Sequence, residues 1–159
     1  MSQDFYRLSI LPYAGIIIKI CRAYTHTQED FEDYYQEVCL QIWRSKDNFK
    51  KESEWATWVY RIALNVCLTL VKKKRITTES YDTNTLTPSQ QNDYSSSNKE
   101  AIDALYTAIK KLSAIDRAVI ILYLEEKSYQ EIAQIMGTNP TNIGVRINRI
   151  KKRLKNILL

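Results

Sequence analysis

The sequence predicts an all-α protein made of two small helical domains that are joined by a flexible linker. Apolar residues recur at spacings of three and four through residues 4–75 and 98–159, which is the period of an amphipathic helix. Between them, 15 of the 23 residues in 76–98 are Ser, Thr, Asn or Gln, and such a segment buries too little apolar surface to fold. We therefore expect a first domain over 1–75, a linker over 76–98 and a second domain over 99–159.

Three helices are expected in the first domain. The first runs from Asp4 to Tyr24 with a kink at Pro12, and its apolar positions are Phe5, Leu8, Leu11, Ile16, Ile20 and Ala23. The second starts at a capping pair, Thr27 and Asp30, and its inward stripe is Phe31, Tyr34, Tyr35, Val38 and Ile42. The third is capped by Ser53, and its inward positions are Trp55, Val59, Ile62, Ala63, Val66, Leu70 and Val71.

The second domain is predicted to end in a helix, a tight turn and a basic helix. A first helix begins near Asn98 with the stripe Ala101, Ile102, Leu105, Ile109 and Leu112, and a second is capped by Ser113 and Asp116 with Ile115, Val119 and Leu122 inside. Ser128 and Glu131 form a capping box, Gly137 ends that helix, and Asn139 followed by Pro140 starts the next. The last helix is expected to bury Ile143, Ile147, Ile150 and Leu154. This compact crossing is typical of a helix-turn-helix.

The distribution of charge indicates an anionic partner. Past Glu131 the chain holds no acidic residue, whereas the last helix carries Arg146, Arg149, Lys151, Lys152, Arg153 and Lys155. Such a helix suits the phosphates of DNA, and Arg and Asn are the side chains best shaped for guanine and adenine. A three-helix scaffold with the same caps is the plainer alternative.

Other classes of function find little support. Cys21, Cys39 and Cys67 are odd in number, far apart and set in apolar patterns, so we expect core thiols. With His26 as the single histidine, neither a metal site nor a histidine triad is expected, and three glycines supply no phosphate-binding loop. We expect no cofactor, no small-molecule substrate and no catalytic residue. The apolar stretch at 10–20 falls short of a membrane span, which favours a cytoplasmic protein without membrane insertion.

Two groups of motifs together resemble one family. In the first domain these are Asp33-Tyr34-Tyr35-Gln36-Glu37, Ile42-Trp43-Arg44, Phe49 and the run from Trp55 to Asn65. In the second they are Leu112 to Arg117, Ser128 to Ala133, Met136-Gly137 and Arg146-Ile147-Asn148-Arg149. In order, spacing and size they resemble regions 2 and 4 of bacterial RNA polymerase sigma factors of the extracytoplasmic-function (ECF) type.

The resemblance implies a role for each domain. Asp33, Gln36 and Glu37 would bind the clamp helices of core RNA polymerase, unless they form only a solvated acidic face. The minus-ten promoter element would be melted and held by Phe49, Trp55, Trp58, Tyr60, Arg61, Asn65, Lys72, Lys73 and Arg75. The minus-thirty-five element would be bound as duplex by a helix from Pro140 to Lys155, through Thr141, Asn142, Arg146, Asn148, Arg149 and Arg153. Members of the family often have an anti-sigma factor as a further partner.

The residues of the first domain suit strand opening on physical grounds as well. Unstacked bases regain stability on aromatic faces and through hydrogen bonds, at about 1–3 kcal/mol for each stack. Trp58 and Asn65 lie off the main apolar stripe and are favoured for DNA, whereas Trp55 suits a core position equally well. The basic run from Lys72 to Arg75 suits either a solvated helix end or a phosphate contact.

Some positions depart from the family pattern. Gly144 stands where a basic or polar contact is usual, at a cost of roughly 1 kcal/mol in a helix interior. Leu64, Leu68 and Thr69 stand where more polar residues are common. We therefore expect an unusual promoter preference. The alternatives to a sigma factor are a free-standing helix-turn-helix regulator and a helical interaction protein, and binding to core RNA polymerase separates the three.

Overall fold

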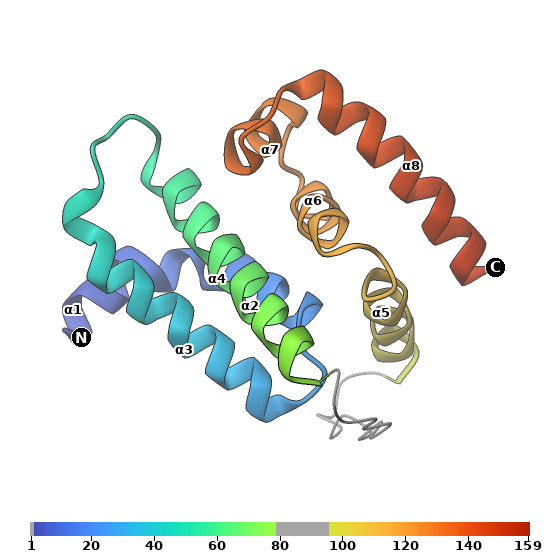
Figure 1. Ribbon diagram of the computed structural model, residues 1–159, viewed down its shortest axis with the longest axis horizontal. Coiled ribbons are helices and arrows are strands. Elements are labelled where there is room, and N and C mark those ends of the chain that lie inside the picture. Colours follow the sequence, from blue (N-terminus) through green and yellow to red (C-terminus); the bar gives the residue numbers. More distant parts are fainter. Residues whose placement is uncertain (1, 79–95) are drawn as a thin grey trace. The chain divides into compact units, whose positions relative to one another are not determined.

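The computed structural model describes residues 2–78 and 96–159, and the regular structure in these ranges is helical throughout (Figure 1). The chain divides into two compact units, residues 1–87 and 88–159. Helix α4 continues to Thr78 and α5 begins at Ser96, so helices enter both ends of the segment that the sequence assigns to a linker. The rest of that segment lies outside the described residues. No helix within 2–78 or 96–159 is long and apolar enough to cross a membrane.

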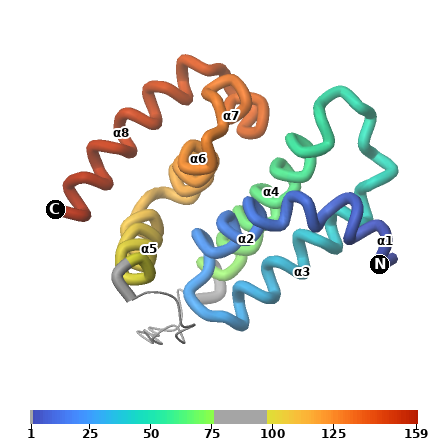
Figure 2. Tube along the Cα trace, turned by 180° about the vertical axis from the view of Figure 1, so that it is seen from behind, coloured from blue at the N-terminus to red at the C-terminus, as the bar shows by residue number. Residues whose placement is uncertain are grey.

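The first unit is built around three helices that contact one another in pairs, namely α2 (Ala14–Ala23), α3 (Gln28–Ser45) and α4 (Trp55–Thr78). Figure 2 shows the N-terminal segment crossing α3 and α4 on one side of this unit. The buried side chains at the centre come from all three helices and include Ile17, Ile20, Val38, Ile42, Val59, Ala63 and Cys67. Thr27 caps α3 as predicted, since its Oγ1 accepts a hydrogen bond from the Asp30 N–H at 3.1 Å.

The N-terminal segment is less regular than the sequence predicts. It consists of α1 (Gln3–Phe5), a π-helical turn η1 (Tyr6–Ile10), a 3-10 turn η2 (Leu11–Tyr13) and then α2. The π turn is wider than an α-helix and the 3-10 turn is tighter. The 3.6-residue period of the apolar positions is therefore lost around Pro12. The predicted inward residues Leu8 and Leu11 are 69% and 48% exposed, and Ile10 and Ile17 are buried instead. This part of the predicted stripe is wrong.

Three further details of the predicted pattern are corrected. Helix α4 starts at Trp55, where the Trp58 N–H donates to the Glu54 carbonyl, so Ser53 lies one residue too early to be its cap. Its most buried face is Val59, Tyr60, Ala63, Leu64 and Cys67, whereas Ile62, Val66, Leu70 and Val71 are only half-buried. In the second unit, Ala101, Ile102 and Ile115 are exposed. A helix that packs on two neighbours buries a wider part of its circumference than one apolar stripe. A prediction from one stripe therefore misplaces the most buried residues of such a helix.

The second unit contains α5 (Ser96–Ile109), α6 (Ala114–Leu124), α7 (Tyr129–Met136) and α8 (Pro140–Leu158). Helix α8 packs against each of the other three. The predicted start signals are confirmed, since Ser113, Ser128 and Asn139 accept hydrogen bonds from the backbone N–H three residues on. The capping box of Ser128 and Glu131 is complete. The last helix buries Ile143, Ile147, Ile150 and Leu154, as predicted.

The three cysteines are buried thiols, as predicted from their apolar surroundings. Cys21 and Cys67 lie side by side in the core with 4.0 Å between their Sγ atoms. Burial raises the pKa of the Cys39 thiol to about 11, and the hydrogen bond to Cys21, with burial, also raises the pKa of Cys67. Cys39 and Cys67 therefore favour the neutral thiol, which is a poor nucleophile.

The ends of α6 and α7 use the same left-handed geometry with different residues. Gly137 ends α7 at φ 76°, where glycine has no side chain to clash. Glu126 follows α6 at φ 63°, with the Glu126 N–H donating to Tyr123 and the Lys127 N–H donating to Leu122. This is a Schellman end in which a glutamate occupies the position that glycine favours.

We expect Glu126→Gly to stabilise the second unit by about 1 kcal/mol, because it relieves the left-handed strain of a side-chain-bearing residue. Gly137→Ala should have the opposite effect and similar size. Hydrogen exchange at the buried amides of Ile147 and Ile150 measures both changes within this unit. Slower exchange in Gly137→Ala, or faster exchange in Glu126→Gly, would contradict this account of the two helix ends.

Candidate nucleic-acid interface and docking surface

Three aromatic rings gather where the loop after η3 (Lys46–Asn48) enters α4. The ring centroids of Phe49 and Trp55 are 5.2 Å apart, those of Phe49 and Trp58 are 5.4 Å apart, and those of the two tryptophans are 4.9 Å apart. Each of these side chains is half-buried. We call Phe49, Trp55 and Trp58 the aromatic cluster. The fold thus brings together three of the residues that the sequence assigns to the minus-ten element.

The two tryptophans of this cluster have different surroundings. The Trp55 Nε1–H donates to the Ser9 carbonyl at 2.8 Å, and the Trp55 ring lies edge-on to Phe5 at 6.3 Å. Trp55 is therefore tied to the N-terminal segment. Within the described part of the chain, the ring contacts of Trp58 are with the other two members of the cluster. Trp55 supports the cluster, while Trp58 is the tryptophan better placed to offer a face to a base.

Helix α4 separates the remaining predicted DNA contacts by burial. Asn65 is exposed and Arg61 is half-buried, and their spacing from Trp58 places all three along one side of the helix. Tyr60 is only 4% exposed, and its ring packs edge-on against Tyr13 at 6.1 Å. Tyr60 lies on the buried side of α4, so its side chain does not suit a direct DNA contact.

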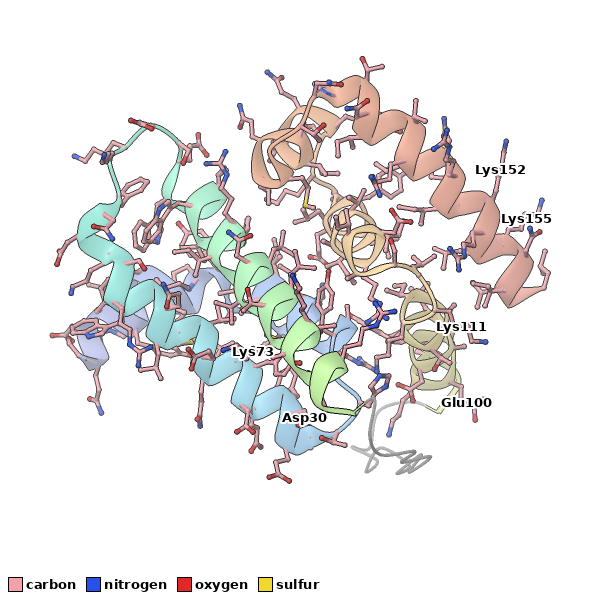
Figure 3. All side chains as sticks on the ribbon, in the orientation of Figure 1. Asp30, Lys73, Glu100, Lys111, Lys152 and Lys155 are labelled. Atoms are coloured by element: carbon pink, nitrogen blue, oxygen red, sulfur yellow. The ribbon has the colours of Figure 1, made fainter. Side chains whose placement is uncertain are left out.

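The basic end of α4 is partly neutralised. Lys74 pairs with the carboxylate of Asp30 in the first turn of α3. Figure 3 labels Asp30 and Lys73, the residue that precedes Lys74. Lys72, Lys73 and Arg75 are exposed. One cation of the basic run therefore joins two helices of the unit, and the other three present positive charge at the surface.

The predicted docking residues lie on one side of α3. Asp33 and Gln36 are exposed, and Glu37 is half-buried with its Oε1 3.8 Å from Arg44 Nη1. Gln36 also borders a shallow, mostly apolar hollow of about 350 Å³, which is lined in addition by Tyr6, Tyr35, Cys39 and Leu40. The hydroxyls of Tyr6 and Tyr35 are hydrogen-bonded at 2.8 Å, and burial raises the pKa of Tyr35 above its ordinary value. The surface therefore combines acidic groups with a neutral hollow.

The second unit presents a complete helix-turn-helix. Gly137 reverses the chain after α7, and Asn139 and Pro140 start α8 with the Asn139 Oδ1 accepting from the Asn142 N–H at 2.9 Å. The apolar stripe of α8 faces inward, so the residues on the opposite side of the helix point out of the unit. Lys152 and Lys155 project from the outer side of the helix in Figure 3.

The sequence-predicted residues of α8 fall into two groups. Thr141, Asn142, Asn148 and Arg149 are exposed, with the Asn142 side-chain amide donating to Thr138 at 3.1 Å. Arg146 and Arg153 instead bond to the unit itself: Arg146 Nη1 lies 2.6 Å from Asp116 Oδ1, and Arg153 Nη2 donates to the Lys111 carbonyl at 3.3 Å. The fold thus separates cations that face outward from cations that hold α8 in place.

Two residues at this site were missed from the sequence. Asp116 was identified as a helix-start residue, but not as the partner of Arg146, which is 30 residues further along the chain. The ring of Tyr129 lies on Gly144, where an added Cβ would be 3.3 Å from Tyr129 Cε2. Gly144 therefore allows close packing of α7 on α8. A tyrosine in the first turn of α7 and a glycine in α8 are the only sequence signals of this contact.

Comparisons with known protein families place both units in one family. Residues 10–76 match Sigma-70 region 2, and residues 102–154 match Sigma-70 region 4. The two matches follow each other in the expected order and cover most of the chain. The chain therefore belongs to the sigma-70 family, with one region in each unit. Within that family it belongs to the ECF type of RNA polymerase sigma factors, as the following relatives show.

Curated relatives share both units with this chain. The ECF RNA polymerase sigma factor SigW of Bacillus subtilis is 26% identical over 99% of this chain and 90% of its own length. The ECF RNA polymerase sigma-E factor of Haemophilus influenzae is 27% identical over 98% of this chain and 88% of its own. SigG of Mycobacterium tuberculosis is 27% identical over 92% of this chain, which spans 46% of the length of that protein.

Solved structures agree on the fold. The sigma factor RpoE of Bartonella quintana, in complex with the anti-sigma factor NepR, superposes with a TM-score of 0.74 at 22% identity, over 99% of this chain and 98% of the other. CnrH, in complex with the cytosolic domain of CnrY, superposes with a TM-score of 0.72 at 18% identity, over 99% and 89%. At such identities the match establishes the fold.

The contacts of the aromatic cluster predict unequal effects of two matched substitutions. Trp55→Phe should destabilise the first unit by about 1 kcal/mol, because it leaves the Ser9 carbonyl without its donor. Trp58→Phe should change stability by less, since no such hydrogen bond is lost. All tryptophans of the chain are in this unit, so urea unfolding followed by the fluorescence of the remaining tryptophans measures both variants. Equal destabilisation would contradict the distinction between the two residues.

Proposed function

We propose that the protein binds core RNA polymerase, directs it to a promoter and promotes strand opening, as a non-catalytic initiation factor in the cytoplasm. The observation that carries the proposal is the joint presence, in one ECF-type chain, of a half-buried Trp58 ring next to Arg61 and the exposed Asn65 on α4, and of an outward-facing basic α8. The first suits unstacked single-stranded DNA, and the second suits the duplex major groove. Because both surfaces belong to one chain, one molecule is able to contact two elements of the same promoter.

Docking on the polymerase is assigned to α3. Asp33, Gln36 and Glu37 share one side of this helix, and the apolar hollow beside Gln36 adds a contact that does not depend on charge. A surface with an apolar centre and an acidic border has the usual composition of a protein–protein interface. The aromatic cluster is formed by residues past the end of α3, so the two proposed contacts use different side chains.

The opened minus-ten element is assigned to the outer side of α4. Trp58 supplies the stacking surface, while Arg61 and Asn65 supply hydrogen-bonding groups one and two turns further along the helix, respectively. Phe49 and Trp55 support Trp58, and Lys72, Lys73 and Arg75 hold the adjacent phosphates. Tyr60 acts only through packing, because its side chain is enclosed.

An anti-sigma factor is proposed as a further partner. RpoE of Bartonella quintana has the same fold and is seen with the anti-sigma factor NepR. A protein that covers the α3 surface of this chain would compete with core RNA polymerase and keep the factor inactive.

The decisive test is binding to core RNA polymerase from the same bacterium. Co-elution in gel filtration, followed by run-off transcription from promoters selected with the complex, is the expected result. DNA binding by the chain in the absence of any complex with core polymerase would identify it as a free-standing regulator and would refute the proposal. Absence of both would leave a helical interaction protein.

Charge reversal tests the docking surface. Asp33→Lys should weaken binding to core polymerase by about tenfold or more, because a repulsive charge replaces an attractive one within the interface. Glu100→Lys is the matched control, since it makes the same change of charge at an exposed glutamate of α5, in the other unit. Fluorescence anisotropy with labelled chain measures both affinities. An equal loss in the two variants would show that overall charge, rather than this face, governs binding.

Alanine at Trp58 or Asn65 should reduce open-complex formation about tenfold while leaving duplex binding nearly unchanged, since each removes one contact with an unstacked base. Permanganate reactivity of promoter thymines reports opening, and mobility shifts with a minus-thirty-five duplex report duplex binding. Lys152→Ala should show the reverse pattern, because Lys152 is on the outer side of α8. Equal loss of opening and duplex binding in Trp58→Ala would remove Trp58 from the site.

A further inference from the structure

The outer side of α8 has a single apolar residue at its centre. At about 100° per residue, Val145 lies almost opposite the buried stripe formed by Ile143, Ile147, Ile150 and Leu154. Val145 is 47% exposed, whereas these four are buried. Valine is also a poorer helix former than alanine, so neither packing nor helix propensity accounts for its presence at this point.

Both flanks of α8 are occupied by contacts with the rest of the unit. On one flank, Arg146 binds Asp116 and Arg153 donates to the Lys111 carbonyl. On the other flank, Gly144 receives the Tyr129 ring, and the Lys151 ammonium lies 4.5 Å from the centroid of the Tyr123 ring. The residues that remain directed away from the unit are therefore those on either side of Val145.

These outward residues have a composition suited to the bases and phosphates of a DNA duplex. They are all exposed, and all except Val145 are polar or basic: Thr141, Asn142, Val145, Asn148, Arg149 and Lys152. In the major groove, the C5-methyl group of thymine is the one apolar feature that a side chain can contact. Val145 lies one helical turn before Arg149, so an apolar contact and a guanidinium contact fall on adjacent base pairs.

We propose that Val145 is a specificity residue that contacts the methyl group of a thymine in the minus-thirty-five duplex, next to base contacts by Asn148 and Arg149. Arg146 is then a positioning residue, which orients α8 through Asp116 and does not read a base. This inference rests on the proposed function, because it names what the outer side of α8 recognises in promoter DNA.

The ion pair supports this assignment by geometry. The Asp116 carboxylate is in the first turn of α6, and its bond to Arg146 is short at 2.6 Å. An arginine that left this partner to reach a base would leave a largely buried carboxylate without it, since the Asp116 side chain is only 20% exposed. Arg149 lies two residues after the buried Ile147 and is exposed. Among the described residues it makes no such competing contact.

The test removes one methyl group from the DNA and the matching side chain from the protein. Full-length chain bound to core RNA polymerase is used to select a duplex from a pool randomised over the minus-thirty-five segment. Each thymine of the selected segment is then replaced by deoxyuridine, which lacks only the methyl group, and affinity is measured for wild type, Val145→Ala and Lys152→Ala. Because Val145 is exposed and alanine favours a helix, Val145→Ala should fold, which circular dichroism verifies.

For wild type, deoxyuridine at one position should weaken binding about threefold to fivefold, as expected for loss of one buried methyl contact. Val145→Ala should bind the thymine probe more weakly and show almost no further loss with deoxyuridine. Lys152→Ala should weaken binding to all probes equally and keep the deoxyuridine effect, because a phosphate contact carries no sequence information.

The inference is overturned if wild type is insensitive to every deoxyuridine, if no thymine is selected, or if Val145→Ala keeps the full effect. In these three cases a sequence is still selected by the polymerase complex, so the proposed function stands. If the chain forms no complex with core polymerase, or the complex selects no sequence, the proposed function fails and the inference fails with it.

Discussion

The burial of one side of each helix is the constraint on which the rest of this structure depends. A helix has one surface to bury and one to present, so fixing the inner residues fixes the direction of every outer one. In α8 the inner residues are three isoleucines and a leucine, and the packing of α8 on α5, α6 and α7 directs Asn148 and Arg149 outward. In α4 the burial of Val59, Ala63 and Cys67 places Trp58 and Asn65 at the surface in the same way.

Sequence reasoning succeeded where local chemistry determines structure. The caps at Thr27, Ser113, Ser128 and Asn139 involve atoms three residues apart. The left-handed φ of Gly137 depends only on the absence of a side chain at that residue. It failed at the N-terminus, where a π turn and a 3-10 turn follow each other before and at Pro12 and interrupt the α-helical period. No periodicity in the sequence shows which of Leu8 and Ile10 is buried, once the helical phase has shifted between them.

The candidate sites show the same division. Burial separates Tyr60 from Asn65, although both are in the run that resembles the family motif. The sequence left Trp55 open between a core residue and a DNA contact, and its hydrogen bond to Ser9 gives it a structural role. The pairing of Arg146 with Asp116 joins residues in different helices, and a single sequence contains no signal of such distant contacts. Residue type identified the helix that we propose to face DNA, but only the fold distinguishes which of its cations already bond within the unit.

The burial of the Cys21, Cys39 and Cys67 thiols has a practical consequence. Maleimide dyes react with thiolates at neutral pH, so the native cysteines should stay unmodified while a cysteine introduced on an exposed residue is labelled. A donor and an acceptor can thus be attached, one to each unit, without first removing any natural residue. Energy transfer between them would report, on single molecules, the distance between the two units when the protein is alone and when it is bound to a partner.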